Sequence, residues 1–485
     1  MVSVAVRDVP NLVDGSEVAA ASGDWLAKLR PSDGSDFCRF ARSRADDVDG
    51  AVAAARRAQP AWARETVVAR GDLVREIALA LRARQDELSD LVAEETGKSP
   101  SLARAETDAA VEMGLFVAGE GRRFYGRTTT ASMQNRTVMA VRQPVGVAGL
   151  LMSFNTPLPN IAWKAFPAIL CGNAAVVKPS EEVPASAHAF VRVAHECGLP
   201  PGVLNLVQGL GEEAGAALVA HPDVDLVSFT GSAATGRRIN EVAARRLAKT
   251  CMELGGKNAL VVCDDADLDG AVRWALASAF SNAGQRCAAA SRLVVFDAVY
   301  DAFRGALVAE ASALSVGSSD DDFLGPVISE RSLDRILGVL ERAKADGARV
   351  LCGAQRVGDA GWHLAPTLLE GAARDAKLSC EELFGPVAAL YRVRDLDEAI
   401  ELVNDSPYGL TAAIHTASLH RAMRFSEEAR VGVVVVNGGT HGSEPHMGFG
   451  GVKQSGTGWR EAGVEALDVY SEWKYVNLIV DPART

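Results

Sequence analysis

Short runs of apolar, mostly β-branched residues recur along the middle of the chain, and segments with helical spacing separate them. The runs that predict strands in this region are Val145–Met152, Ala174–Lys178, Leu204–Val207, Asp225–Phe229 and Ala259–Val262. Between them, Ala185–Cys197 and Glu212–Ala220 have the spacing of helices. This alternation is typical of a parallel α/β sheet.

A second series of strand-like runs follows the first. It comprises Arg292–Phe296, Val387–Val393, Ala412–His415 and Gly432–Asn437. The two series predict an α/β protein with two sheets. No internal repeat, low-complexity tract or flexible linker interrupts them, so we expect the domains to pack closely.

The N-terminal part, to about Gly126, reads as a loop-rich entry followed by helices. We expect Asp72 to cap a helix with a packing role. The apolar residues that fall mostly at helical spacing in it are Leu73, Ile77, Leu81, Leu88 and Leu91.

The composition excludes several classes of protein. With 48% hydrophobic and 23% charged residues, the chain of 485 residues is unlike a disordered protein. Its net charge of −12 argues against a nucleic-acid surface. The longest apolar runs, Val145–Met152 and Val431–Val436, fit buried strands and fall short of the ~20 residues of a membrane helix. The first ten residues lack the long apolar core of a signal peptide.

The cysteines and histidines indicate neither a disulfide framework nor a metal site. The eight cysteines are scattered and none forms a C-x-x-C pair, so a reducing cytoplasm is the simplest compartment. His441, Glu444 and His446 lie close together, but no further ligand is evident, and we expect no metal.

One candidate phosphate-binding turn follows a predicted strand. In SFTGSAATGRRI (Ser228–Ile239), Gly231 and Ser232 open a helix, and a helix N-terminus offers free N–H groups to a phosphate. No G-x-G-x-x-G fingerprint is present. The nearest string, Gly209–Gly215, has the wrong spacing and fits a turn that leads into a helix.

Two other motifs each allow a plain and a chemical interpretation. In CMELGGKN (Cys251–Asn258), Glu253 is either a general base or a surface carboxylate. In FSNAGQRCAAASR (Phe280–Arg292), Cys287 is either a small buried hydrophobe or a thiolate near a helix terminus, where the thiol pKa is lowered.

Taken together, the motifs resemble the aldehyde dehydrogenase superfamily. The resemblance extends from about Asp46 to Glu472 in the family's order and has high specificity. The other segments that carry it are SFNTPLPNIAWK (Ser153–Lys164), AAVVKPSE (Ala174–Glu181), EELFGPV (Glu381–Val387) and GFGGVKQSGTGWREAG (Gly448–Gly463).

The resemblance implies two doubly wound, Rossmann-like α/β domains and a β-flap for oligomerisation. The NAD(P)-binding domain would comprise residues 1–126 and 145–253, and the catalytic thiol domain 254–437. The flap would comprise 127–144 and 469–485, while 438–468 return to the cofactor domain and the substrate entrance. The strand-like segments Arg136–Arg142 and Tyr470–Val480 belong to neither series, and their edges need a partner. We expect a homodimer or homotetramer.

The resemblance also implies the roles of individual residues. Cys287 matches the nucleophile, Glu253 the general base and Asn155 the amide that stabilises the oxyanion, while Lys164 and Glu461 match proposed proton relays. The positions that match cofactor-binding residues are Lys178, Ser180 and Glu181 for the adenosine ribose, Gly231 and Ser232 for the phosphates, Leu254, and Glu382 and Phe384 for the nicotinamide side.

The substrate pocket departs from the usual family pattern. Gly448, rather than proline, precedes Phe449, Ser153 stands where many members have proline, and Trp459 lies inside the Gly–Arg–Glu junction. By position, the residues nearest the substrate are Thr156, Trp163, Arg286 and Phe449.

Arg286 has two interpretations: it pairs with an anionic substrate tail, or it forms a salt bridge within the catalytic domain. Succinate-semialdehyde-type relatives carry their arginine at a position corresponding to Ser281 instead.

The predicted function is oxidation of an aldehyde to the carboxylic acid through a cysteine thiohemiacetal and a thioester. Glu253 favours hydrolysis of the thioester over its transfer to CoA. Glu181 can accept hydrogen bonds from both ribose hydroxyls, which favours NAD, although NADP is possible. One alternative is a semialdehyde dehydrogenase for an aldehyde with a carboxylate or phosphonate group. Another is a non-catalytic relative with a structural or binding role.

Overall fold

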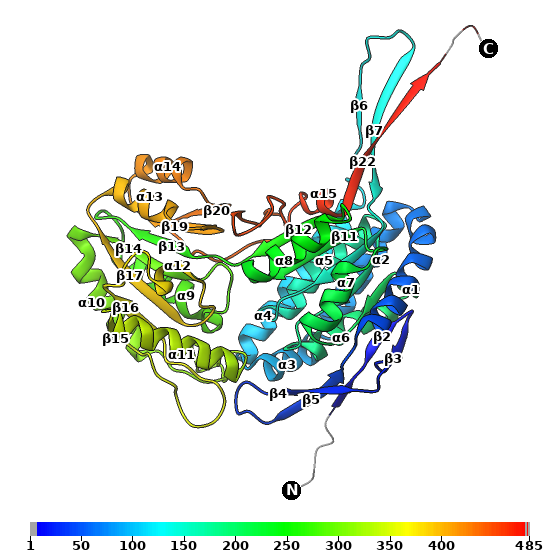
Figure 1. Ribbon diagram of the computed structural model, residues 1–485. Helices are drawn as coiled ribbons and strands as arrows, with labels where there is room; N and C mark the ends of the chain where they lie inside the picture. Colours follow the sequence, from blue (N-terminus) through cyan, green and yellow to red (C-terminus); the bar gives the residue numbers. More distant parts are fainter. Residues whose placement is uncertain (1–6, 481–482, 484–485) are drawn as a thin grey trace.

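The structure, a computed structural model, describes residues 7–480 and 483 and has two α/β lobes, with a β-ribbon projecting from one of them (Figure 1). Each lobe is built on a seven-stranded sheet, and the ribbon is a separate three-stranded sheet. The predicted α/β class is confirmed. Within residues 7–480 and 483, no helix combines the length and the apolar character needed to cross a bilayer.

The sheet of the first lobe is parallel except at one edge. Its strands are β2 (Asn11–Val13), β3 (Ser16–Val18), β8 (Val147–Leu151), β9 (Ala174–Lys178), β10 (Leu204–Leu206), β11 (Leu226–Gly231) and β12 (Lys249–Leu254). They lie in the order β12-β11-β8-β9-β10-β2-β3, with β2 and β3 antiparallel to their neighbours. Every residue of β8 and β9 is buried, as expected where helices cover both faces of a parallel sheet.

Helices cover both faces of this sheet. On one face lie α2 (Val67–Ala83), α4 (Pro100–Glu120), α5 (Pro157–Leu170) and α6 (Pro184–Glu196), which share a core with Val177. On the other lie α1 (Ala45–Arg64), α7 (Ala216–Ala220) and α8 (Ala233–Ala244), which pack with Val176. Because adjacent side chains of a strand point to opposite faces, one apolar strand supplies both cores.

The second lobe repeats this arrangement. Its strands are β13 (Asn258–Val262), β14 (Ala290–Phe296), β15 (Arg349–Cys352), β16 (Thr367–Glu370), β17 (Val387–Val393), β19 (Thr411–His415) and β20 (Val433–Val436). Their order is β15-β16-β17-β14-β13-β19-β20, and only β15 is antiparallel. One core contains α9 (Leu268–Phe280) and α10 (Asp297–Ala313), and the other contains α11 (Glu330–Ala345), α12 (Lys377–Cys380), α13 (Leu396–Asn404) and α14 (Leu419–Glu428).

The projecting ribbon unites distant parts of the chain. It consists of β6 (Arg127–Thr129), β7 (Arg136–Pro144) and β22 (Ser471–Ile479), which follows the short helix α15 (Ala466–Tyr470). Strands β7 and β22 pair antiparallel along their whole length, from Ser471 opposite Pro144 to Ile479 opposite Arg136. The prediction of two strands outside both sheets is therefore confirmed, and each is the other's partner.

The N-terminal part differs from its prediction in two ways. It contains strands as well as loops: β1 (Arg7–Val9), β4 (Trp25–Leu29) and β5 (Asp36–Ala41) form a small sheet. The prediction that Asp72 caps a helix is wrong. Helix α2 begins earlier, where the Thr66 side chain accepts a hydrogen bond from the Ala69 N–H, and Asp72 lies inside the helix, paired with Arg75. Leu88 and Leu91 belong to a separate helix, α3 (Gln85–Thr96).

Two other expectations change in detail. The segment predicted as one helix, 212–220, begins as a π-helical turn, Gly211–Gly215, before α7. The run Val431–Val436, predicted to be buried, is only partly so, because β20 is the edge strand of its sheet and pairs with β19 alone. The short strands β18 (Tyr408–Gly409) and β21 (Val452–Lys453) form a two-stranded sheet of their own.

Candidate active site

The carboxyl ends of the parallel strands of the first lobe carry several of the predicted site residues. Asn155 lies in the loop between β8 and α5, Glu253 is the penultimate residue of β12, and Gly231 is the last residue of β11. Ligands of open α/β sheets bind at this edge, where the loops after the strands converge. Sequence order alone scatters these residues over nearly a hundred positions, and the strand order β12-β11-β8 makes them neighbours.

The candidate nucleophile, Cys287, lies in a turn of the second lobe that is bonded to the Asn155 loop. The turn follows the 3₁₀ segment Ser281–Gly284, in which Asn282 has a left-handed φ of 53°. The Asn282 side chain donates a hydrogen bond of 3.1 Å to the Asn155 carbonyl oxygen. The Asn258 side chain donates one of 2.7 Å to the Cys287 carbonyl oxygen. The structure thus links Cys287 and Asn155 across the two lobes.

The predicted lowering of the thiol pKa is wrong for the protein without ligands. Burial raises the pKa of Cys287 to about 12, and the carboxylates of Glu382 and Glu253 add to the effect. Arg286 and the Ala288 N–H oppose it only in part. The residue lies in a turn rather than at the first turn of a long helix, so no helix dipole offsets its burial. The thiol is therefore protonated at neutral pH.

Glu253 is buried, which excludes its interpretation as a surface carboxylate. Its residue is 5% exposed, and neither carboxylate oxygen has a hydrogen-bond partner among the described residues. Burial, together with the nearby Glu461 carboxylate, raises its pKa well above the ordinary value. A buried carboxylate without partners is costly, and such groups are concentrated at functional sites.

Lys164 and Glu461 form a buried ion pair, and both charges act on the carboxyl group of Glu253. The Lys164 Nζ lies 2.7 and 2.6 Å from the two carboxylate oxygens of Glu461 and 2.8 Å from the Ser228 hydroxyl. The Ser228 hydroxyl donates a hydrogen bond of 2.6 Å to Glu461, and the Cys251 thiol lies 3.6 Å from the same oxygen. These contacts hold the carboxylate of Glu461 in one orientation.

The residues predicted to bind the adenosine ribose are the last residue of β9, Lys178, and Ser180 and Glu181 just beyond it. Lys178 is buried, and its Nζ lies 3.7 Å from the Glu181 carboxylate. Burial lowers the pKa of Lys178 to about 8. Ser180 and Glu181 are both partly exposed, so their polar atoms remain accessible to a ligand.

The predicted phosphate turn opens α8. The Ser232 side chain is the N-cap and accepts a hydrogen bond from the Thr235 N–H. Leu254, at the end of β12, packs on Gly236 so closely that an added Cβ would lie 2.5 Å from a methyl group of Leu254. Gly236 therefore lets α8 approach the strand, which keeps the helix N-terminus at the edge of the sheet.

Glu382 and Phe384 reach this edge from the second lobe. The Glu382 carboxylate accepts a hydrogen bond of 3.1 Å from the Gly256 N–H, and burial raises its pKa to about 7. The Phe384 ring meets the Phe154 ring edge to face, with 5.5 Å between the centroids. The two predicted nicotinamide-side residues therefore contact the loop that follows β12 and the loop that carries Asn155.

Comparison with known proteins agrees with this geometry. Residues 18–476 match the sequence profile of the aldehyde dehydrogenase family. The chain belongs to this family. Similar relatives include the α-ketoglutaric semialdehyde dehydrogenase of Bacillus subtilis, 34% identical over 473 residues that cover 96% of this chain and 97% of the relative. The NADP(+) succinate-semialdehyde dehydrogenase of Escherichia coli is 36% identical over 467 residues, covering 96% of each.

Solved structures of the aldehyde dehydrogenase family have the same fold. The lactaldehyde dehydrogenase of Escherichia coli aligns with a TM-score of 0.96 and 34% identity, covering 98% of this chain and all of that one (100%). The betaine aldehyde dehydrogenase of Staphylococcus aureus, solved in complex with NAD+, aligns with a TM-score of 0.95 and 32% identity, covering 98% and 95% of the two chains. The resemblance drawn from the motifs is confirmed.

Two of the predicted pocket residues of this family member, Trp163 and Phe449, form an aromatic pair, and a third, Thr156, is polar. Trp163 and Phe449 meet edge to face at 5.7 Å, and the backbone of Phe449 exchanges two hydrogen bonds with that of Glu461. The Thr156 hydroxyl accepts a hydrogen bond from the Asn160 side chain. The Ser281 hydroxyl donates to the Ala277 carbonyl oxygen, so it is engaged with the end of α9.

Arg286 forms no ion pair with any residue of the described chain, 7–480 and 483, and its Nε is buried without a hydrogen-bond partner. Burial lowers its pKa, whereas the Glu106 and Cys287 side chains raise it. Among the described residues, the Arg286 guanidinium therefore lacks the salt bridge within the catalytic domain that one of its two interpretations predicts. His446 and Glu444 are exposed at 3.7 Å from each other, and the described residues contain no cluster of three metal-ligating side chains.

Sequence reasoning missed the residues that hold Asn155 in place. The Asn160 side chain donates a hydrogen bond of 3.3 Å to Asn155 Oδ1, so the Nδ2 group of Asn155 points elsewhere. Lys98 and Asn282 both donate to the Asn155 carbonyl oxygen. Asn160 lies five positions after Asn155, outside the spacing of three or four residues at which side chains of one helix meet, so the spacing gave no signal of the contact. Nothing in the sequence around Lys98 indicates its partner.

Proposed function

We propose that the protein oxidises an aldehyde to a carboxylic acid with NAD(P), with Cys287 as the nucleophile, Asn155 as an oxyanion donor and Glu253 as the general base. The observation that supports this most is the buried, unpartnered carboxylate of Glu253, whose charge acts on the Cys287 thiol. The 3₁₀ segment that precedes the turn of Cys287 is bonded to the Asn155 loop through Asn282. A non-catalytic role would give no reason to keep such a carboxylate buried.

In the first step the Cys287 thiol gives up its proton to solvent, and the thiolate sulfur attacks the aldehyde carbon. The carbonyl oxygen becomes an oxyanion, which the Asn155 Nδ2 group and the Cys287 N–H stabilise. One such donor contributes about 3–4 kcal/mol to the transition state. The hydrogen bond from Asn160 to Asn155 Oδ1 supports this assignment, because it leaves the Nδ2 donors free.

The residues at the edge of the first sheet fit a dinucleotide. Lys178 and Glu181 would bind the adenosine ribose, and the N-terminus of α8 at Gly231 and Ser232 would face the phosphates. Leu254, Glu382 and Phe384 would contact the nicotinamide half. When bound, NAD(P) supplies the acceptor for the hydride that the tetrahedral adduct loses as it becomes a thioester.

In the last step Glu253 removes a proton from water, which attacks the thioester and releases the acid. The Lys164–Glu461 pair, whose charges act on the carboxyl group of Glu253, would pass this proton onward with Ser228. The buried base supports hydrolysis of the thioester rather than its transfer to CoA.

The experiment that tests this function is a panel of aldehydes monitored by NADH absorbance. We expect turnover with at least one aldehyde and stoichiometric formation of its acid. No turnover with any neutral or anionic aldehyde, despite tight binding of NAD, would favour the structural or binding alternative instead.

We expect NAD to be preferred over NADP, because the Glu181 carboxylate would accept hydrogen bonds from the ribose hydroxyls and repel a 2′-phosphate. Hydrogen bonds to a charged group contribute about 1.5–3 kcal/mol, so kcat/KM should be about 10- to 100-fold higher with NAD. Steady-state kinetics with both cofactors measure the ratio, and Glu181→Ala should reduce it. A ratio below one in the unaltered enzyme would contradict the assignment.

The raised pKa of Cys287 predicts a distinctive pH dependence of thiol alkylation. Only the thiolate reacts, and at a pKa of about 12 its fraction grows tenfold with each pH unit throughout the neutral and alkaline range. In the protein without cofactor, the rate of inactivation by iodoacetamide should therefore rise from pH 7 to 10 without a plateau. A plateau below pH 8 would mean that the thiolate is already stabilised, and Cys287→Ala measures background labelling.

A second candidate function is oxidation of a semialdehyde with an anionic tail. Arg286 supports it, since this guanidinium lies beside the nucleophile without an ion-pair partner in the described chain. Two of the relatives carry the names of semialdehyde dehydrogenases. At the position where succinate-semialdehyde-type relatives carry their arginine, this chain has Ser281, whose hydroxyl donates to the Ala277 carbonyl oxygen. This supports Arg286 as the candidate anion contact.

Arg286→Ala tests this candidate. Loss of a charge-assisted contact of about 1.5–3 kcal/mol should lower kcat/KM for an anionic aldehyde by about 10- to 100-fold. The value for a neutral aldehyde of equal length should change by less than about threefold. Arg286→Lys keeps the charge and should restore part of the loss. Equal losses for both substrates would exclude the anion contact.

The architecture supports separate functions for the two lobes and a homo-oligomer formed through the ribbon. We assign cofactor binding to residues 1–126 and 145–253 and the thiol chemistry to 254–437, with 438–468 at the substrate entrance. The ribbon, within 127–144 and 469–485, has an exposed apolar face that includes Tyr475 and Ile479, which supports a homodimer or homotetramer. All eight cysteines are free, which supports a reducing compartment such as the cytoplasm.

A further inference from the structure

We propose that Lys98, paired with Glu106, is a positioning residue that acts through the peptide carbonyl of Asn155. The inference rests on the proposed function, in which the Asn155 amide stabilises the oxyanion. It adds a buried ion pair from the helical layer of the first lobe to the groups on which the reaction depends.

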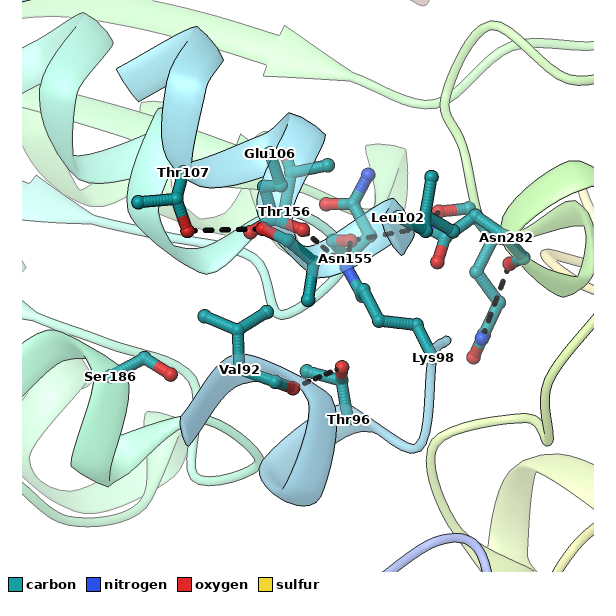
Figure 2. Close-up of polar contacts among 12 residues, drawn as sticks. Val92, Thr96, Lys98, Leu102, Glu106, Thr107, Asn155, Thr156, Ser186 and Asn282 are labelled. Atoms are coloured by element: carbon teal, nitrogen blue, oxygen red, sulfur yellow. Dashed lines mark hydrogen bonds and ion pairs between the residues drawn. The ribbon is translucent and has the colours of Figure 1, made fainter. Parts of the chain in front are cut away.

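The chain directs Lys98 into the interior by a sharp turn. Helix α3 ends at Thr96, and its C-cap, Gly97, has a left-handed φ of 75°. A Cβ at Gly97 would lie 2.5 Å from Pro326. The next residue, Lys98, extends from this loop so that its Nζ lies between Glu106 and Asn155 (Figure 2). The Nζ group binds the Glu106 carboxylate and donates a hydrogen bond of 3.0 Å to the Asn155 carbonyl oxygen.

The Lys98–Glu106 ion pair is buried, and a contribution to the stability of the protein does not by itself explain why two charges lie there. The side chains of Lys98 and Glu106 are each 4% exposed. A buried ion pair is often no more stable than well-packed apolar residues of the same volume, because both charges lose their hydration. The contact that apolar residues could not replace is the third one, from the Nζ to the Asn155 carbonyl oxygen.

The hydrogen bond from the Lys98 Nζ to the Asn155 carbonyl oxygen forms whether the proton between Lys98 and Glu106 lies on the amine or on the carboxylate. Burial lowers the pKa of Lys98 and raises the pKa of Glu106, while each side chain opposes the shift of the other. A charged ammonium has three hydrogens to donate and a neutral amine has two. In both states one hydrogen remains for the Asn155 carbonyl oxygen.

Three separate segments meet at this oxygen. Lys98 comes from the loop before α4, Asn155 from the loop before α5, and Asn282 from the turn that precedes Cys287. With both donors in place, the two lone pairs of the carbonyl oxygen are occupied. The peptide of Asn155 is therefore held on both sides, and its distance from the Cys287 turn is set.

Such a constraint matters because an oxyanion donor must lie within about 2.7–3.1 Å of the developing charge. A displacement of about 1 Å can reduce a rate about a hundredfold. If the Lys98 donor is lost, the Asn155 peptide can rotate, and its Nδ2 group moves away from the oxyanion. Ground-state binding of the aldehyde does not use this contact, so kcat should fall while KM changes little.

The test compares Lys98→Met with the double variant Lys98→Met/Glu106→Leu on a neutral aldehyde. The single variant leaves Glu106 buried without its cation and can lose stability, whereas the double variant removes both charges and should keep a near-normal Tm. Both should show kcat lowered roughly 10- to 100-fold with KM within about threefold. Lys344→Met, which removes the exposed partner of Glu341, is the matched control and should be indistinguishable from the unaltered enzyme.

The decisive measurement repeats the double substitution in an Asn155→Ala background. If Lys98 acts through Asn155, the double substitution should lower kcat by less than a further twofold in the Asn155→Ala background. A merely structural role predicts the same loss in both backgrounds, and that result would overturn the proposal. A normal kcat in a folded Lys98→Met/Glu106→Leu variant would also overturn the proposal.

A second readout needs no cofactor. Acylation of Cys287 by p-nitrophenyl acetate forms an oxyanion at the same place, so its rate should fall by the same factor. An unchanged acylation rate would overturn the proposal. If the unaltered protein oxidises no aldehyde at all, the proposed function fails and this inference with it, whereas an active enzyme that is insensitive to Lys98 contradicts this inference alone.

Discussion

Replacing Cys287 by alanine should abolish aldehyde oxidation, with kcat/KM lowered by at least about 10⁴-fold. Without the sulfur, no covalent adduct forms, and the oxyanion donors have no tetrahedral intermediate to stabilise. NADH absorbance with the best substrate of the panel measures the loss. The binding of NAD should be unchanged, because Cys287 contributes no cofactor contact in the assignment given above.

The matched control for this variant is Cys352→Ala. Cys352 lies on β15 at the far edge of the second sheet, where its thiol contacts the Pro366 carbonyl oxygen. Its replacement should leave turnover unchanged. Appreciable turnover by Cys287→Ala would mean that another group is the nucleophile, and trapping with a radiolabelled aldehyde would then identify it.

Glu253→Gln should lower steady-state turnover by about 10²- to 10⁴-fold, the usual contribution of a general base. The amide has nearly the shape of the carboxylate but cannot accept a proton, so water attacks the thioester slowly. With p-nitrophenyl acetate, the variant should release one p-nitrophenolate per active site in a burst and then nearly stop. Mass spectrometry of the stopped enzyme should show an acetyl group on Cys287.

The control for Glu253→Gln is the surface variant Glu341→Gln, which should hydrolyse the ester at the normal rate. Loss of turnover without an accumulated acyl-enzyme would show that Glu253 acts before the thioester forms. Full activity of Glu253→Gln would show that Glu253 is not the general base. The two variants therefore separate attack by Cys287 from hydrolysis of its adduct.

The sequence predicted the elements whose signal is local. Strands such as Ala174–Lys178 consist of consecutive apolar residues that only a sheet covered on both faces can bury, and the structure has this strand at the same residues. Helix boundaries were less predictable. The sequence predicted Asp72 as the cap of a helix, whereas α2 begins at Val67 with Thr66 as its N-cap.

The chemistry of the candidate site depended more strongly on tertiary structure. The motif around Cys287 suggested a lowered thiol pKa, but burial raises it, and the carboxylates of Glu382 and Glu253, which come from other segments, add to the effect. Arg286 could be recognised as a neighbour of the nucleophile, whereas the lack of an ion-pair partner in the described chain could not be predicted from its own sequence context.

By itself, the amino-acid sequence determined the α/β class and most strands and nominated the candidate reactive side chains, because these depend on residue type and short-range spacing. Only the tertiary structure decided how those side chains act together. The contact of Lys98 with Asn155 joins residues 57 positions apart, and that of Lys164 with Glu461 joins residues 297 positions apart. Such contacts, and the burial that shifts the pKa values, arise when distant segments pack, and no local pattern encodes them.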